Sequence, residues 1–122
     1  MVVGIGIDIV SPKKVEEAIK RWGDGFIDRV FNPEEVNPIQ KGKVYYQRLA
    51  ARFAAKEAVV KSLSKNYSLA LRDIVITNLP NGAPVCTFKK EVNLVVSISI
   101  SHIEEYAVAC ALAQRLTPDA VA

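Results

Sequence analysis

Residues 52–61, with the sequence RFAAKEAVVK, lie inside a segment from Lys43 to Lys65 that contains no Gly or Pro. The segment is rich in Ala, Leu, Lys and Glu, which predicts a long helix. At about 100° per residue, its apolar stripe comprises Leu49, Phe53, Val60 and Leu63. We therefore interpret the rest of the chain around this central helix.

Lys56 falls inside that apolar stripe, where a cation is costly unless it is paired or bound to an anion. Arg52 precedes it by one turn, and Glu57 and Lys61 form a second edge at i, i+4. The simpler interpretation is a solvated helix with an ordinary Glu–Lys pair, which contributes roughly 0.2–0.5 kcal/mol. The alternative is that the cations around one carboxylate bind a phosphate-rich ligand, partly through a metal ion.

The length of 122 residues indicates one domain, which we place at residues 1–116, with residues 117–122 as a loose C-terminal tail. The net charge of +3, from 16 basic and 13 acidic residues, is too mild to indicate nucleic acid. Basic residues are concentrated in the first quarter, which holds Lys13, Lys14, Lys20, Arg21 and Arg29. This cluster fits an acidic partner, or else a surface that only keeps the protein in solution.

The two cysteines, Cys86 and Cys110, lie in apolar runs and lack the spacing of a zinc site. We expect buried free thiols and a cytoplasmic location. No signal peptide is evident, and no apolar run approaches the roughly 20 residues that a membrane span needs. We therefore expect no membrane partner.

The chain opens with a predicted strand over residues 2–10. Its alternating apolar face comprises Val3, Ile5, Ile7 and Ile9. The opposite face carries Gly4 and Gly6, which indicate that another element approaches closely. The alanines of the central helix would permit that approach, and Asp8 would then face the helix at the strand end. Asp8 could equally cap the helix that follows.

Shorter helices are expected before the central one. Ser11-Pro12 predicts a helix that continues to about Trp22. Its apolar face comprises Val15, Ala18, Ile19 and Trp22. Further short helical segments are expected at residues 25–30 and after Asn32-Pro33, before Pro38.

After the central helix, the pattern changes to strands at residues 73–79, 85–88, 94–102 and 106–112. The last two predict an antiparallel pair, and residues 80–84 predict a turn. The order predicts a single α+β domain, with an antiparallel sheet packed on the long helix and shorter N-terminal helices. The last strand has a small-residue face of Ala107, Ala109 and Ala111, which we expect to be covered between subunits.

The residues alone indicate a metal-assisted reaction on a phosphate. Asp8 and Glu57 offer two hard oxygen ligands, and Mg²⁺ takes the remainder of its shell from water and substrate phosphates. Lys56, Lys61 and Arg52 would offset the phosphate charge. No Walker or Rossmann loop is present. The lone His102 is more commonly a structural hydrogen-bonding residue than a catalyst.

Five segments, in order and with similar spacing, resemble the 4′-phosphopantetheinyl transferases of the small stand-alone type, the holo-[acyl-carrier-protein] synthases. They are residues 4–10 (GIGIDIV), 26–31 (FIDRVF) with Glu35, 49–58 (LAARFAAKEA) with Lys61, 81–84 (NGAP), and 99–102 (SISH) with 105–107 (EYA). The resemblance covers about residues 2–116. Three positions depart from that family: Ala51 replaces a frequent glycine, and Ala83 and Glu104 replace frequent lysines.

The resemblance implies that Asp8 and Glu57 ligate Mg²⁺ and that Lys61 contacts a coenzyme A phosphate. The other residues that it places along the coenzyme A site are Arg52, Lys56, Gly82, Pro84, Ser101 and His102. It also implies a homotrimer with active sites between neighbouring subunits. Because carrier proteins are acidic, Lys13, Lys14 and Arg21 become the expected docking surface.

The implied reaction transfers 4′-phosphopantetheine from coenzyme A to a serine of apo acyl carrier protein, with Asp8, Glu57 and Lys61 as the catalytic residues. The base could be Glu57 or a metal-bound water. The sequence leaves open which carrier is modified, whether fatty acid synthesis is served, and whether acylated coenzyme A is accepted. The competing interpretations are a non-catalytic module that binds an acidic carrier domain and a small nucleic-acid-binding domain.

Overall fold

A computed structural model describes residues 1–116, so the expected tail at 117–122 lies outside the described residues. The helices are α1 (Pro12–Trp22), α2 (Asp24–Val30), α3 (Pro33–Val36), α4 (Tyr45–Leu63) and the short 3₁₀ helix η1 (Leu71–Asp73). The strands are β1 (Val2–Val10), β2 (Ile74–Asn78), β3 (Pro84–Phe88), β4 (Leu94–His102) and β5 (Ala107–Arg115). The predicted α+β class and the order of elements are confirmed.

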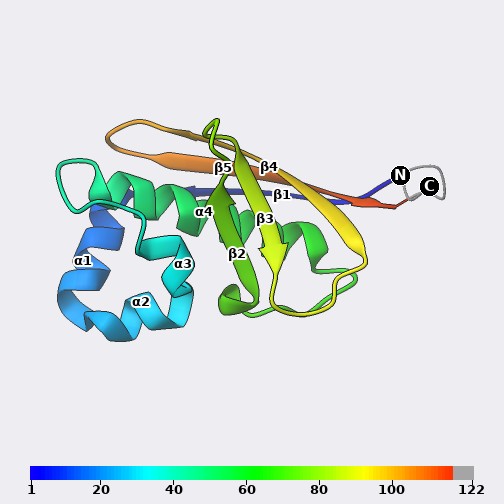
Figure 1. The fold of residues 1–122 in the computed structure, drawn as a ribbon, viewed down its shortest axis with the longest axis horizontal. Helices are drawn as coiled ribbons and strands as arrows, with labels where there is room; N and C mark the ends of the chain where they lie inside the picture. The colour runs from blue at the N-terminus through cyan, green and yellow to red at the C-terminus, as the bar shows by residue number, and fades with distance from the viewer. Residues whose placement is uncertain (117–122) are drawn as a thin grey trace.

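The strands form two sheets. The larger is antiparallel, with the order β1-β5-β4, and β2 and β3 form a separate antiparallel hairpin. The helix α4 packs against the large sheet, while α1, α2 and α3 gather at one end of it (Figure 1). The central strand, β5, continues beyond the predicted end at Leu112. No helix within residues 1–116 is long and apolar enough to cross a membrane.

The packing of β1 on α4 confirms the close approach that the two strand glycines predicted. A Cβ atom added at Gly4 would lie 1.8 Å from the backbone oxygen of Ser62, and one at Gly6 would lie 2.0 Å from that of Ala58. No side chain fits at these distances. Glycine therefore lets β1 lie directly on the helix backbone, and the next residue on that strand face is Asp8.

The alanine face of β5 is covered by this chain's own helix, so the expectation that another subunit covers it is wrong. Ala107, Ala109 and Ala111 are at most 1% exposed and belong to the core beneath α4. Small side chains face the helix because α4 itself is rich in alanine and packs closely. The outer face of the sheet is the open one, since Ile5 and Ile7 are 66% and 63% exposed.

The helix α1 begins as predicted, with the Ser11 side chain accepting a hydrogen bond from the Lys14 amide at 3.4 Å. Val15 is buried, but Trp22 is 63% exposed, so its assignment to the core-facing side was wrong. Gly23, with a positive φ of 58°, ends the helix immediately after Trp22. The Arg21 guanidinium instead lies 5.0 Å from the Trp22 ring centre.

Candidate active site

A pocket of about 410 Å³ opens between α4, the β2–β3 hairpin and the end of β4. Its walls include four residues that the sequence placed along a ligand site, namely Arg52, Gly82, Pro84 and His102. The other residues of the lining are Pro38, Ile39, Arg48, Ala51, Ile76, Asn78 and Ile100. Two arginines and an exposed imidazole on mainly apolar walls suit a ligand that is anionic and partly flat.

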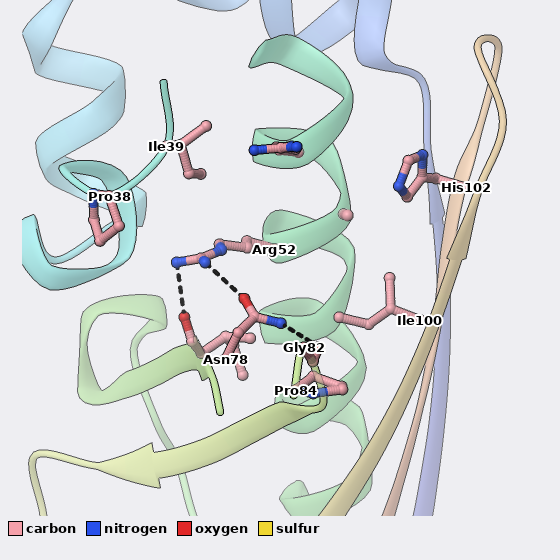
Figure 2. Close-up of a pocket in the computed structure, with 11 residues that line it drawn as sticks. Pro38, Ile39, Arg52, Asn78, Gly82, Pro84, Ile100 and His102 are labelled. Carbon is pink, nitrogen blue, oxygen red and sulfur yellow. Dashed lines mark hydrogen bonds between the residues drawn. The ribbon is translucent and has the colours of Figure 1, made fainter. Parts of the chain in front are cut away.

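The Arg52 guanidinium is fixed against one wall of this pocket (Figure 2). It donates to the backbone oxygen of Glu35 at 2.5 Å and that of Ile76 at 3.2 Å, and to the Asn78 side chain at 2.8 Å. The Asn78 amide in turn donates to the backbone oxygen of Gly82 at 2.9 Å. Burial lowers the pKa of Arg52 from its ordinary value, and the nearby Glu35 opposes that shift.

Asp8, Glu57 and Lys61 gather where β1 crosses α4. The Lys61 ammonium lies 3.2 Å from Asp8 Oδ1 and donates to the backbone oxygen of Ile7 at 2.9 Å. Burial, and after it the charge of Asp8, raise the pKa of Glu57, while Lys61 acts in the opposite direction. The structure therefore brings together the three residues predicted to be catalytic.

The acid pair has the chemistry of a partial site for a hard cation. Among the described residues, no group of three or more His, Cys, Asp or Glu side chains could hold a metal. Two neighbouring carboxylates repel one another, and a cation between them favours the ionised form of both. Such a pair fits Mg²⁺, which keeps waters and substrate oxygens as its other ligands.

Lys56 does not line the pocket. Its ammonium is fully buried and lies 2.5 Å from Glu35 Oε1, with both side chains 0% exposed. Burial lowers the pKa of Lys56, and the hydrogen bond and charge of Glu35 counteract that effect. The contact with coenzyme A expected of Lys56 therefore remains a prediction that its buried position argues against.

Glu35 is the residue whose role the sequence interpretation missed. Its Oε1 accepts a hydrogen bond of 2.8 Å from the backbone N–H of Asn32, which is one half of a capping box. The Asn-Pro-Glu-Glu run at residues 32–35 carries that signal, because an acid stands three residues after a capping residue. The long-range partner on α4, 21 positions away, leaves no local signal.

The remaining predicted residues lie at different places. Ser101 does not line the pocket and is exposed on the face of β4 opposite to Ile100, as the alternation predicts. Lys13 and Lys14 are exposed and line a second hollow, of about 800 Å³, between α1 and the β4–β5 turn. Arg21 is also exposed, so the basic residues of α1 are open to a partner.

The pocket and the acid cluster lie on different sides of α4. Arg52 and Glu57 are five positions apart, which separates them by about 140° around the helix. Asp8 comes from β1 and His102 from β4, and β5 lies between these two strands. One chain therefore does not bring its own acid pair and its own pocket into a single cavity.

The sequence profile described as the 4′-phosphopantetheinyl transferase superfamily matches residues 4–111. A holo-[acyl-carrier-protein] synthase of Dehalococcoides mccartyi is 38% identical, over 89% of this chain and 96% of its own length. That of Desulforudis audaxviator is also 38% identical, over 93% of each chain. This chain belongs to the 4′-phosphopantetheinyl transferase superfamily, among its holo-[acyl-carrier-protein] synthases.

Solved structures agree with this assignment. A holo-(acyl-carrier-protein) synthase of Bacillus anthracis, in complex with CoA (3′,5′-ADP), has a TM-score of 0.83 and 32% identity, over 95% of this chain and 99% of that one. The Helicobacter pylori enzyme in complex with coenzyme A has a TM-score of 0.80 and 34% identity, over 90% and 99%. The fold is therefore one that binds coenzyme A in related proteins.

Proposed function

We propose that this chain transfers 4′-phosphopantetheine from coenzyme A to a serine of an apo acyl carrier protein. The observation that carries the proposal is the acid pair of Asp8 and Glu57 beside Lys61, on a fold whose relatives are named for this reaction. The free thiols of Cys86 and Cys110 are consistent with a reducing cytoplasm as its location.

The reaction breaks the phosphoanhydride bond of coenzyme A and forms a phosphodiester on the carrier. The serine oxygen of the carrier forms a bond to the β-phosphorus of coenzyme A, and the bond to the bridging oxygen breaks. Adenosine 3′,5′-bisphosphate leaves with that electron pair, and the serine loses its proton. Glu57 or a bound water would receive the proton, while Lys61 lies where it would offset phosphate charge.

Asp8 and Glu57 would hold Mg²⁺, which when bound supplies positive charge to the phosphates. The pocket residues Arg52 and His102 would bind the nucleotide end of coenzyme A. Arg48 adds a second guanidinium to the same wall and suits the 3′-phosphate. With the nucleotide end in the pocket, the pyrophosphate of coenzyme A would extend toward an acid pair.

We further propose a homotrimer in which the pocket of one subunit and the acid pair of its neighbour form one site. The support is the separation of the two groups within one chain and the apolar outer face of the sheet. That face exposes Ile5, Ile7 and Ile9 on β1, each more than 60% accessible, and large open apolar faces are typical of subunit contacts.

Mixing two inactive variants tests the shared site. Arg52→Ala removes one of the two pocket guanidinium groups, and Glu57→Gln removes the acid. At a coenzyme A concentration well below the KM of the Arg52 variant, each variant alone is expected to be nearly inactive. If subunits exchange, a mixture regains activity, because some sites combine an intact pocket with an intact acid pair. A mixture that stays as inactive as its components, with exchange verified by mass, would contradict the shared site.

The basic residues Lys13, Lys14 and Arg21 on α1 would dock the acidic carrier. Their exposure leaves them open to long-range attraction, which mainly increases the association rate and weakens with salt.

Intact-protein mass spectrometry tests the proposed reaction. The purified chain is incubated with an apo acyl carrier protein, coenzyme A and Mg²⁺, and again with the metal chelated. The expected result is a mass gain of one phosphopantetheine on the carrier, which is lost with the chelator and absent from a carrier whose serine is replaced by alanine. No gain on any of several carriers would contradict the transferase and favour a carrier-binding module.

A further inference from the structure

The buried ion pair between Glu35 and Lys56 is not used by the proposed reaction. Both side chains are 0% exposed, and among the described residues no buried side-chain nitrogen or oxygen lacks a hydrogen-bond partner. A buried pair is weak evidence for stability, since apolar side chains of similar volume often stabilise a protein equally well. Its geometry therefore merits a separate explanation.

The Glu35 carboxylate joins three elements. Its Oε1 accepts hydrogen bonds from Lys56 on α4 and from the backbone and side chain of Asn32 before α3, at 2.5, 2.8 and 3.2 Å. Its Oε2 accepts a hydrogen bond from the backbone N–H of Ile76 on β2, at 2.8 Å. One side chain thus sets the position of α3 and β2 relative to α4.

The backbone groups that this carboxylate positions are those that hold Arg52. The Arg52 guanidinium donates to the backbone oxygens of Glu35 and Ile76, the same two residues that meet at the carboxylate. Its other nitrogen binds Asn78, which holds the turn at Gly82 (Figure 2). A continuous path of hydrogen bonds therefore leads from the buried pair to two walls of the pocket.

We infer that Glu35 and Lys56 are positioning residues, which set the place of Arg52 and of the β2–β3 turn and so determine the affinity for coenzyme A without touching it. This inference rests on the proposed function only in its choice of ligand. A guanidinium binds a phosphate through charge-assisted hydrogen bonds that depend on its orientation, so a displaced Arg52 binds coenzyme A more weakly. Loss of the pair should therefore appear in ligand affinity and only slightly in the rate at saturation.

The decisive variants are Glu35→Gln and the double variant Glu35→Met/Lys56→Met. In the first, an amide replaces one acceptor oxygen with a donor, which faces the N–H or ammonium donors already there. The second removes both charges together, so that no unpaired charge is left in the core. The matched control is Glu34→Gln, the same change one residue earlier, where the carboxylate is half-exposed and pairs only with Lys89 on the surface.

Calorimetric titration with coenzyme A, at a temperature where circular dichroism shows every variant folded, measures the effect directly. We expect Kd to rise about tenfold or more in Glu35→Gln and in the double variant, as for the loss of one hydrogen bond to a charged group, and to stay at the parental value in Glu34→Gln. In transfer assays KM for coenzyme A should rise similarly, while kcat changes little, because a loss of binding shared by the ground state and the transition state raises KM without lowering kcat.

Should Glu35→Gln not fold, the double variant alone decides the matter. A role confined to stability would lower the melting temperature and leave Kd for coenzyme A unchanged in the folded protein, and that result would overturn the inference. Failure of the parental protein to modify any carrier, despite binding coenzyme A, would overturn the proposed function and leave the affinity comparison intact.

Discussion

Lys56 and Glu57 are neighbours in sequence and about 100° apart on α4, and they have opposite surroundings. Lys56 points into the core and is matched by a carboxylate, with no exposed surface. Glu57 is half-buried beside a like charge, Asp8, and burial and that charge raise its pKa. A buried charge that is paired with its counterion belongs to the framework of the fold. An accessible charge that lies beside a like charge instead indicates a site for a cation and a substrate.

The largest effect is expected from Lys56→Met. The substitution leaves the Glu35 carboxylate buried without its cation, which lowers the free energy of unfolding by about 3–5 kcal/mol. Urea denaturation at a single protein concentration measures it. The control is Lys89→Met, whose partner Glu34 is 48% exposed, and it should change stability by about 0.5 kcal/mol or less. Equal effects of the two substitutions would remove the contrast between framework and surface pairs.

Glu57→Gln should lower the transfer rate about a hundredfold or more, because it removes a proposed ligand of Mg²⁺ and a group that can accept the serine proton. The same variant should be slightly more stable than the parent in metal-free buffer at pH 7. Burial and Asp8 raise the pKa of Glu57 above its ordinary value of 4.5, so its ionised form destabilises the folded protein above that pH.

Thermal melting at several pH values tests whether Glu57→Gln is more stable than the parent, as expected. The stability gain of Glu57→Gln should disappear as the pH falls below about 4, where the parental carboxyl is protonated in both states. A variant that melts below the parent at pH 7 would show that Glu57 is a framework residue like Glu35. Glu34→Gln, with its exposed carboxylate, serves as the control for assay and melting.

A smaller effect is expected from reversing charge on α1. Lys14→Glu with Arg21→Glu should raise KM for the carrier about tenfold at low salt, with kcat nearly unchanged. Screening should reduce the difference as the salt concentration rises toward 1 M, where the Debye length is only about 3 Å. Lys65→Glu, at an exposed lysine beyond α4, controls for the net charge of Lys14→Glu alone, because each single reversal changes the net charge by the same amount. An effect that is independent of salt would argue against electrostatic docking.

The smallest effect is expected at Asp73, which is not part of the pocket lining or of the acid pair. Its carboxylate accepts from the Ala70 amide at 2.9 Å and lies 3.2 Å from the Lys90 ammonium. The amide first, then Lys90, lower the pKa of Asp73, so its stabilisation is present above about pH 4 and is lost as the pH falls through the lowered value. Asp73→Ala should reduce stability by about 1 kcal/mol at pH 7 and by less in acid, as measured by melting.

The sequence predicted those features whose cause is local or periodic. Gly4 and Gly6 on one strand face indicated close contact with a helix, and Asp8 followed on the same face, so its meeting with α4 could be anticipated. The strand at residues 94–102 was predicted to the residue, because apolar residues and serines alternate over residues 96–101.

The features that the sequence did not reveal depend on distant partners. The pattern located Lys56 in the core, but its counterion is 21 positions away and belongs to another helix. The alternation in β5 separated alanines from larger residues without showing which face α4 would cover. The division of the site residues between two sides of α4 also became clear only in three dimensions.

The most direct test of the contrast between Glu57 and the Glu35–Lys56 pair is the rate of transfer at saturating coenzyme A and carrier, followed by intact mass. It is measured for the parent, Glu57→Gln and Glu35→Met/Lys56→Met, with each protein verified as folded. We predict that Glu57→Gln is slower by about a hundredfold, whereas the double variant keeps most of the parental rate. A double variant as slow as Glu57→Gln, or a Glu57→Gln protein as fast as the parent, would contradict the division of roles along α4.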